Sequence, residues 1–199
     1  MDGHRFSKIP IVHDLPSSWL QAVIDVRGAG ENAWGMEMNW HVRRSLALTG
    51  RTVASLRVWD VLRGIEALRS MPEVNPDKIM IAAEADMAVP ALYAALLDGN
   101  IYAVALKDPP ASQNLPSQSN GFDNVTEIIN SLRHTDLAQV AGLIWPAGLI
   151  FLGNRPESYR WSENVHHQLG EPGGVWRVPS LAEWKYRKKG CDRRDGNVL

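Results

Sequence analysis

The fold class can be inferred from residues 52–106, which read TVASLRVWDVLRGIEALRSMPEVNPDKIMIAAEADMAVPALYAALLDGNIYAVAL. The first third repeats apolar residues at helical spacing and ends before a proline, so it predicts a helix over residues 53–70. The repeated residues are Val53, Leu56, Trp59, Leu62 and Ile65. Two apolar runs, residues 78–83 and 101–106, have the length of buried strands, and the Ala- and Leu-rich segment 86–98 between them predicts a helix. This alternation indicates an α/β fold with a parallel sheet.

The same alternation continues outward from this stretch. Further strands are predicted at residues 20–26, 148–152 and 175–178. Further helices are predicted at residues 125–133, 137–143 and 157–169. Segments rich in Gly, or in Pro, Ser and Asn, predict long loops at residues 28–49 and 107–124. Right-handed crossovers would cover both sheet faces, so we expect a three-layer αβα sandwich with a mostly parallel sheet.

The 199 residues divide into three expected parts. Residues 1–19, broken by two prolines, form an irregular N-terminal segment; residues 20–184 form the α/β domain; residues 185–199 form a basic, flexible tail. The first 14 residues have no apolar stretch of the kind that signal peptides carry. We therefore predict no signal peptide in this chain and assign no location.

Charge and motifs exclude several classes of function. The chain has 21 basic and 22 acidic residues, so no nucleic-acid or polybasic membrane partner is expected. No apolar run reaches the ~18 residues of a spanning helix. Gly28 and Gly30 do not form a dinucleotide motif, and His166 and His167 would point about 100° apart on a helix. With Cys191 the one cysteine, we predict no cofactor, no metal site and no internal disulfide.

Three passages together carry a family resemblance. They are IDVRGAGEN (24–32), residues 52–84, and PALYAALLDGNIYAVALKDPPAS (90–112). In order and spacing the chain resembles the branch of the α/β-hydrolase superfamily that contains acetyl xylan esterases, dienelactone hydrolases and prolyl-oligopeptidase domains. The resemblance implies an α/β-hydrolase-like fold, shortened at the N-terminus, and descent from carboxylic-ester hydrolases that act on acetylated saccharides. It also implies that Asp108, which ends a predicted strand, lies near the position of the family's active site.

The family's nucleophile stands on a sharp strand-to-helix turn, Gly-x-Ser-x-Gly. The resemblance places that turn on residues 83–87, with Ala85 at the serine position and Ala83 and Met87 at the glycine positions. We expect these replacements to relax or reshape the turn. The family's histidine follows the last strand, but no histidine occurs after His167, and its acid position falls near Asn154, with Glu157 a little late. The expected result is an acetyl xylan esterase-like protein without an intact catalytic triad.

Several alternatives stay open for the acidic residues. Asp86 is either a nucleophile in a slipped register or a cap of the helix that follows. Glu84 is either a buried acid with a raised pKa or a partly solvated residue at the sheet end. Asp25 and Arg27 are expected to form a local ion pair, and Asp60 to be structural or solvated.

The alternatives for function also remain open. The chain is either an impaired esterase, a hydrolase that uses Asp86, or a non-catalytic binding or structural partner domain. The expected ligand is a small ester or an acetylated saccharide. A sheet edge left by missing N-terminal strands would favour a homo-oligomer or a partner domain.

Overall fold

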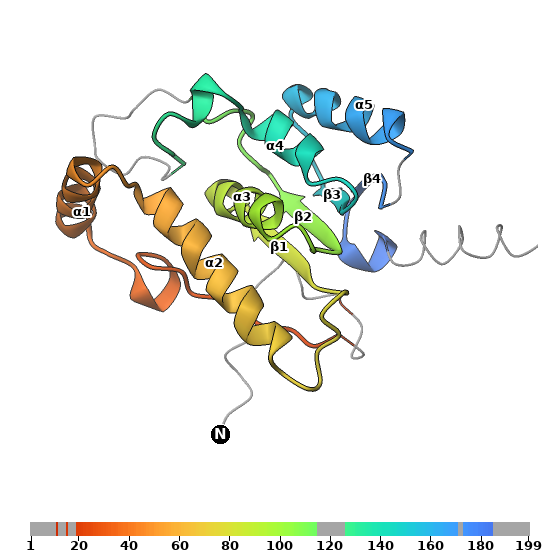
Figure 1. The fold of residues 1–199 in the computed structure, drawn as a ribbon, viewed down its shortest axis with the longest axis horizontal. Helices are drawn as coiled ribbons and strands as arrows, with labels where there is room; N and C mark the ends of the chain where they lie inside the picture. The colour runs from red at the N-terminus through yellow and green to blue at the C-terminus, as the bar shows by residue number, and fades with distance from the viewer. Residues whose placement is uncertain (1–10, 12–14, 16–18, 115–125, 171–172, 185–199) are drawn as a thin grey trace, which may run out of the picture.

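A computed structural model describes residues 11, 15, 19–114, 126–170 and 173–184 of the chain. Its helices are α1 (Met36–Leu48), α2 (Val53–Arg69), α3 (Ala88–Asp98), α4 (Leu137–Leu143) and α5 (Arg160–Gln168). Its strands are β1 (Met80–Glu84), β2 (Ala103–Lys107), β3 (Gly148–Leu152) and β4 (Val175–Val178). Figure 1 shows α2 to α5 on one side of the sheet and α1 at one end of the molecule. The predicted irregular segment and tail lie almost wholly outside the described residues.

The four strands form one sheet in the order β1-β2-β3-β4, and all neighbours are parallel. Each crossover therefore returns to the strand next to the one it left. Every residue of β3 is buried, because that strand has a neighbour on both sides and packed layers above and below. The predicted α/β fold with a parallel sheet is confirmed, and the predicted bounds of β3 and β4 coincide with the observed ones.

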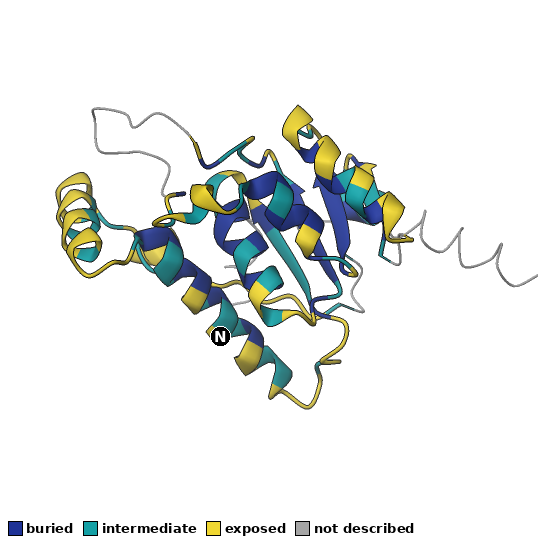
Figure 2. Ribbon diagram, turned by 45° about the horizontal axis from the view of Figure 1, so that its top comes forward, coloured by how far each residue is buried: buried dark blue, intermediate teal, exposed yellow. Residues whose placement is uncertain are grey.

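Two separate cores cover the two faces of the sheet. Leu106, Leu149 and Phe151 pack against α2, α3 and α4 on one face. Ala105 and Ile150 pack on the other face against residues 11, 15 and 19 and a helical segment at residues 181–184. These two layers and the sheet between them make the three-layer arrangement, and Figure 2 shows the sheet as its buried centre.

Helix α2 begins with a reciprocal cap. Ser55 N donates to Thr52 Oγ1 over 3.1 Å, and Thr52 N donates to Ser55 Oγ over 3.0 Å. The buried residues of the helix are Val53, Ala54, Arg57, Val58, Val61 and Ile65. Trp59, which the sequence pattern places on the buried stripe, is instead 54% exposed, with the Arg63 guanidinium 4.4 Å from its ring.

Three predicted elements are wrong. Residues 20–26 are not a strand: residues 20–25 are exposed and pair with no strand among the described residues. The predicted loop 28–49 contains α1, none of whose residues is buried. The predicted helix 125–133 is reduced, in its described part, to a 3₁₀ turn at Ser131–Arg133. Residues 20–25 are exposed and α1 buries no residue, so packing against the core does not decide the conformation of these two segments.

The segment 20–26 is nevertheless fixed against α2. Val26 is 5% exposed, and a side chain at Gly64 would overlap Ile24, whose Cδ1 lies 2.4 Å from the place of a Cβ. Strand β1 has β2 on one side and no described strand on the other. The predicted association through a sheet edge stays a prediction.

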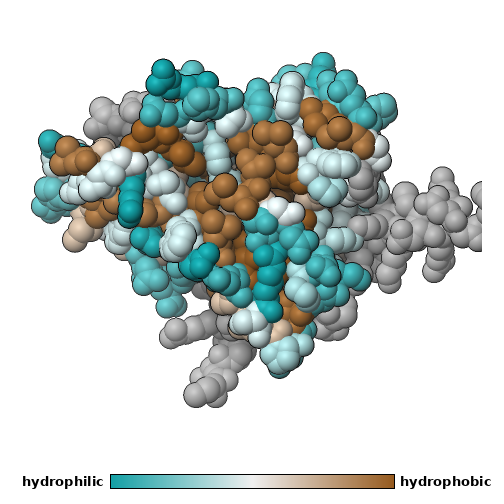
Figure 3. Space-filling model, in the orientation of Figure 1, coloured by the Kyte–Doolittle hydropathy of each residue, from teal (hydrophilic) through white to brown (hydrophobic). Residues whose placement is uncertain are grey.

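The helical side of the molecule exposes some apolar surface. Hydrophobic side chains gather over α3 and α4 in the view of Figure 3. Leu97 and Leu143 are the exposed large apolar residues of these two helices. Among the described helices, none has the length and apolar character needed to cross a membrane.

Candidate functional site

The turn between β1 and α3 is tight at Ala85, the residue that the sequence resemblance predicts at the serine position. Ala85 follows the last residue of β1, has a φ of +50°, and begins a 3₁₀ turn that leads into α3 at Ala88. A residue other than glycine rarely takes this left-handed conformation, because its Cβ approaches its own backbone. Ala83 and Met87 therefore have not relaxed the turn at Ala85, contrary to expectation. Ala85 is exposed, so the turn presents a methyl group at this position.

Glu84 is an exposed, paired carboxylate and not a buried acid. Its Oε1 accepts a hydrogen bond from Lys107 Nζ over 2.7 Å. The two residues are direct partners in the register of β1 and β2, so the pair forms across the ends of two neighbouring strands. The same hydrogen bond raises the pKa of Lys107. Of the two interpretations of Glu84, the structure favours the partly solvated one.

Asp86 is half-buried beside an arginine. Burial raises the pKa of its carboxyl, while the nearby charge of Arg57 lowers it by a smaller amount. The expected helix cap is absent, since neither the 3₁₀ turn nor α3 has a side-chain cap hydrogen bond. Asp86 lies inside the 3₁₀ turn, one residue before the N-cap position of α3, and so is misplaced for capping.

Arg57 is a buried cation that the sequence pattern does not single out. It is 5% exposed; its Nε donates to the main-chain O of Arg27 over 3.1 Å, and its Nη2 to that of Gly28 over 3.0 Å. Burial lowers its pKa, and the charges of Asp86 and Asp60 act in the opposite direction. Its position four residues after Val53 is the one signal that could have identified it as buried.

Arg27 pairs with Asp60 on α2 and not with Asp25. Arg27 Nε donates to Asp60 Oδ2 over 2.8 Å, Arg27 N donates to the same atom over 3.0 Å, and Arg27 Nη2 donates to Asp60 Oδ1. The hydrogen bond from the Arg27 guanidinium lowers the pKa of Asp60. Asp60 is therefore a structural residue, as one alternative proposed, and the expected local pair of Asp25 is corrected.

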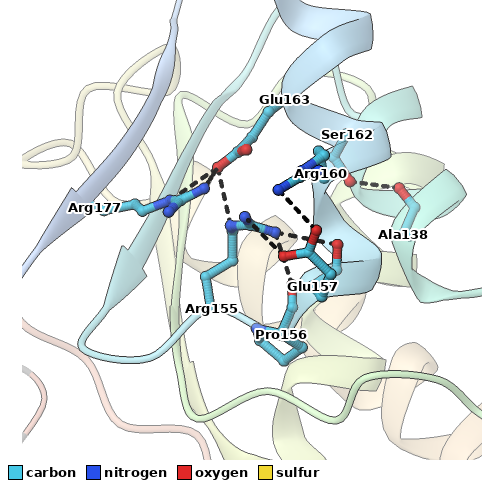
Figure 4. Close-up of polar contacts among 8 residues, drawn as sticks. All are labelled: Ala138, Arg155, Pro156, Glu157, Arg160, Ser162, Glu163 and Arg177. Atoms are coloured by element: carbon cyan, nitrogen blue, oxygen red, sulfur yellow. Dashed lines mark hydrogen bonds and ion pairs between the residues drawn. The ribbon is translucent and has the colours of Figure 1, made fainter.

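Glu157 belongs to a charged network at the ends of β3 and β4 (Figure 4). Its carboxylate contacts Arg160 Nη2 at 2.9 Å and Arg155 Nη2 at 3.8 Å. Glu163 on α5 contacts Arg155 Nε at 3.0 Å and Arg177 Nη2, on β4, at 2.6 Å. No described contact joins Glu157 to the β1–α3 turn, and β2 separates β1 from β3.

Two of the described histidines, His166 and His41, lie on α5 and α1. His166 on α5 is fully buried, with Nε2 3.4 Å from the main-chain O of Ala141. His41 lies on α1, where its Nε2 is 3.9 Å from Glu37 Oε1. No group of three or more His, Cys, Asp and Glu side chains in the described part of the chain is arranged to hold a metal ion.

Comparison with known proteins identifies the fold. No protein-family model matches the chain, and no curated protein matches its sequence. The solved structure of a candidate acetyl xylan esterase from Bacteroides fragilis matches with a TM-score of 0.63 at 15% identity, over 79% of this chain and 46% of that one. A glucuronoyl esterase of carbohydrate esterase family 15 from Caldicellulosiruptor kristjansonii matches with a TM-score of 0.44 at 16% identity, over 71% of this chain and 50% of that one.

The match to the Bacteroides fragilis structure shows that the chain has an α/β-hydrolase fold. At 15% identity, the match shows the fold alone. The chain spans less than half the length of that protein. Its own chemistry depends on the side chains that it presents at the ends of β1, β2 and β3.

Proposed function

We propose that this chain is an α/β-hydrolase-fold domain of esterase descent that binds a small ester or acetylated saccharide and does not hydrolyse it by a serine mechanism. The observation that carries the proposal is the backbone of Ala85. Its left-handed turn, with φ at +50°, keeps the strand-to-helix geometry of an elbow, while its side chain is a methyl group. A methyl group has no lone pair with which to attack a carbonyl carbon.

The neighbouring groups support loss of catalysis as well. Acyl transfer needs a base within hydrogen-bond reach of the nucleophile and a carboxylate that orients the base. Glu84 is paired with Lys107, and Glu157 with two arginines. His166 is enclosed beneath α4. None of these described contacts supplies a base to the turn at Ala85.

A second candidate function is hydrolysis with Asp86 as the nucleophile, favoured by its half-buried carboxyl one residue after Ala85. The raised pKa counts against it, because a nucleophilic carboxylate must be ionised. Arg57 would have to hold the negative charge at Asp86, yet two of its nitrogens already bind main-chain oxygens. Non-catalytic binding therefore takes priority over this second candidate.

The test is a search for an acyl-enzyme on the full chain. The chain, mixed with p-nitrophenyl acetate, is expected to show no burst of p-nitrophenolate, and mass spectrometry should find no adduct after a serine-directed phosphonate. Ala85→Ser should stay inactive, since the base is missing as well as the hydroxyl. A stoichiometric burst in the unmodified chain would overturn the proposal, and its loss in Asp86→Asn would establish the second candidate.

A further inference from the structure

Helix α1 has little of the packing that usually stabilises a short helix in a folded protein. It has 13 residues, and none of them is buried. Helices of this length are only marginally stable in water unless an apolar face packs against another element. The half-buried residues of α1 share one face of the helix; they are Asn39, Val42, Arg43 and Leu46. Figure 2 shows the rest of α1 as exposed, at one end of the molecule.

The face of α1 that is turned away from these residues carries large apolar side chains, although a solvent-facing surface is usually polar. Exposed residues follow one another there at four-residue spacing and form one row along the helix; they are Met36, Trp40, Arg44 and Leu48. Leu48 is 90% exposed, Met36 50% and Trp40 45%. Figure 3 shows hydrophobic side chains on the surface at the end of the molecule where α1 lies. Apolar side chains that adjoin one another at a surface indicate contact with a partner.

This row of α1 is complementary to itself when two copies of the helix lie antiparallel and level at Val42. Met36 then lies opposite Leu48 of the second copy, so an apolar side chain meets an apolar side chain at each end. Trp40 lies opposite Arg44 of the second copy, and a guanidinium is attracted to the face of an indole ring. The same contact already exists within α1, where the Arg44 guanidinium lies 4.4 Å from the Trp40 ring. A two-fold interface requires such reciprocity, since each residue must fit the residue that fits it.

The charges beside the row are complementary in the same antiparallel arrangement. Glu37 lies in the first turn of α1, and Arg44 lies in its second half. Antiparallel packing therefore brings Glu37 of each copy near Arg44 of the other, at two equivalent contacts. The Glu37 side chain is 92% exposed, and its 3.9 Å separation from His41 Nε2 is too long for a hydrogen bond. Antiparallel packing also sets the positive end of each helix dipole beside the negative end of the other.

The exposed side of α2 has a similar stacked pair but no such row. The Arg63 guanidinium lies 4.4 Å from the ring of Trp59, which is also exposed. The row at four-residue spacing through this pair begins at Ser55 and ends at Ala67, so it has no large apolar side chain at either end. The apolar ends of the row therefore distinguish α1 from a helix that simply faces solvent.

We infer that α1 is a dimerisation helix, which packs antiparallel against α1 of a second copy of this chain across a two-fold axis. The contact surface is the row that runs from Met36 to Leu48, with Glu37 and Arg44 paired between the copies. One pair of short helices buries less than the roughly 1,200 Å² of a standard stable interface, so the dimer is weak and dissociates on dilution. The inference is independent of the proposed function, because it concerns neither the ligand nor the chemistry at Ala85.

The test uses two charge reversals and their mixture, followed by sedimentation velocity. The unmodified chain should change from monomer to dimer as its concentration rises from about 10 µM to about 1 mM. Glu37→Arg and Arg44→Glu should each weaken dimerisation about tenfold, because like charges then face each other at both contacts. An equimolar mixture of these two variants should dimerise again, since opposite charges then meet at both contacts of the mixed dimer.

Arg63→Glu is the matched control, because it makes the same change of charge beside an exposed tryptophan on α2; it should dimerise like the unmodified chain. The three substituted residues are exposed, so the variants should keep their fold. An unmodified chain that stays monomeric throughout the concentration range overturns the inference. A dimer that Arg44→Glu leaves intact, or a mixture of the two variants that stays monomeric, overturns it as well. The esterase assay reports on the proposed function alone.

Discussion

Arg27 and Asp60 form a two-point ion pair that fixes the turn after residues 20–26 to the middle of α2. The pair is only partly screened by solvent, with side chains 37% and 19% exposed. Arg57 reinforces it from the same helix by binding the main-chain oxygens of the turn. Residues 20–26, which pair with no described strand, are in this way held in place by side chains of α2.

Asp60→Asn is expected to destabilise the chain by about 1–2 kcal/mol at neutral pH, less than a fully buried pair would lose. The pKa of Asp60 is lowered in the folded chain, so its contribution is present above the ordinary carboxyl pKa and is lost as the pH falls below it. Chemical denaturation from pH 7 to acid should show the two proteins converge in stability. A constant difference down to about pH 2 would contradict this origin, since Asn does not titrate.

Ala85→Gly should stabilise the chain by about 1 kcal/mol, because glycine has no Cβ to clash with the backbone at positive φ. Part of this stabilisation is offset, because glycine also gives the unfolded chain more conformational entropy. The matched control is Ala67→Gly, at an exposed position inside α2, which should destabilise by about 1 kcal/mol. Thermal unfolding of both variants measures the difference. Destabilisation by Ala85→Gly would mean that the turn is not left-handed at this residue.

Asp86→Asn should stabilise the chain at neutral pH. Because burial raises the pKa of Asp86, the folded chain binds this proton more tightly than the unfolded chain does. Stability is then greatest in acid and falls as the pH rises through the ordinary carboxyl pKa to the raised one. Since Asn stays neutral, the variant should exceed the unmodified chain at pH 7 and match it in acid. Lower stability at pH 7 would show that attraction to Arg57 outweighs burial.

Glu163→Gln should cost about 2 kcal/mol, because it takes from the Arg155 guanidinium, whose side chain is 5% exposed, the closer of its two charged partners. Glu157→Gln is the control: its side chain is 72% exposed, and its loss should change stability by under about 0.5 kcal/mol. Urea unfolding of the two variants compares them directly. Equal effects would contradict the central place of Glu163 in the network of Figure 4.

The sequence is most informative where burial is complete. Residues 148–152 form a continuous apolar run between turn residues, and this pattern fits only a strand with neighbours on both sides, so β3 could be predicted to the residue. The run at 20–26 is also mostly apolar, although it contains Gln21 and Asp25. A strand also needs a partner, and local sequence does not report whether one is present. Helix α1 was not predicted because none of its residues is buried, so its sequence has no continuous apolar stripe that would indicate a helix.

The candidate site could be located from sequence but not described. Counting from the strand puts Ala85 at the turn, and the structure gives that residue the left-handed backbone of an elbow. The positive φ of Asp108, +47°, could not be foreseen, since a residue before proline is ordinarily extended. Arg57 falls outside the predicted apolar stripe, which follows three-residue spacing, whereas the buried face of α2 follows four-residue steps.

Because the spatial order of the strands repeats their order along the chain, each strand after β1 pairs with the strand that is synthesised just before it. β2 can join β1 before β3 has been translated, and no strand waits for a distant one to arrive. Such sequential growth shortens the loops that must close during folding. The four-stranded sheet can therefore grow one strand at a time from β1 toward β4.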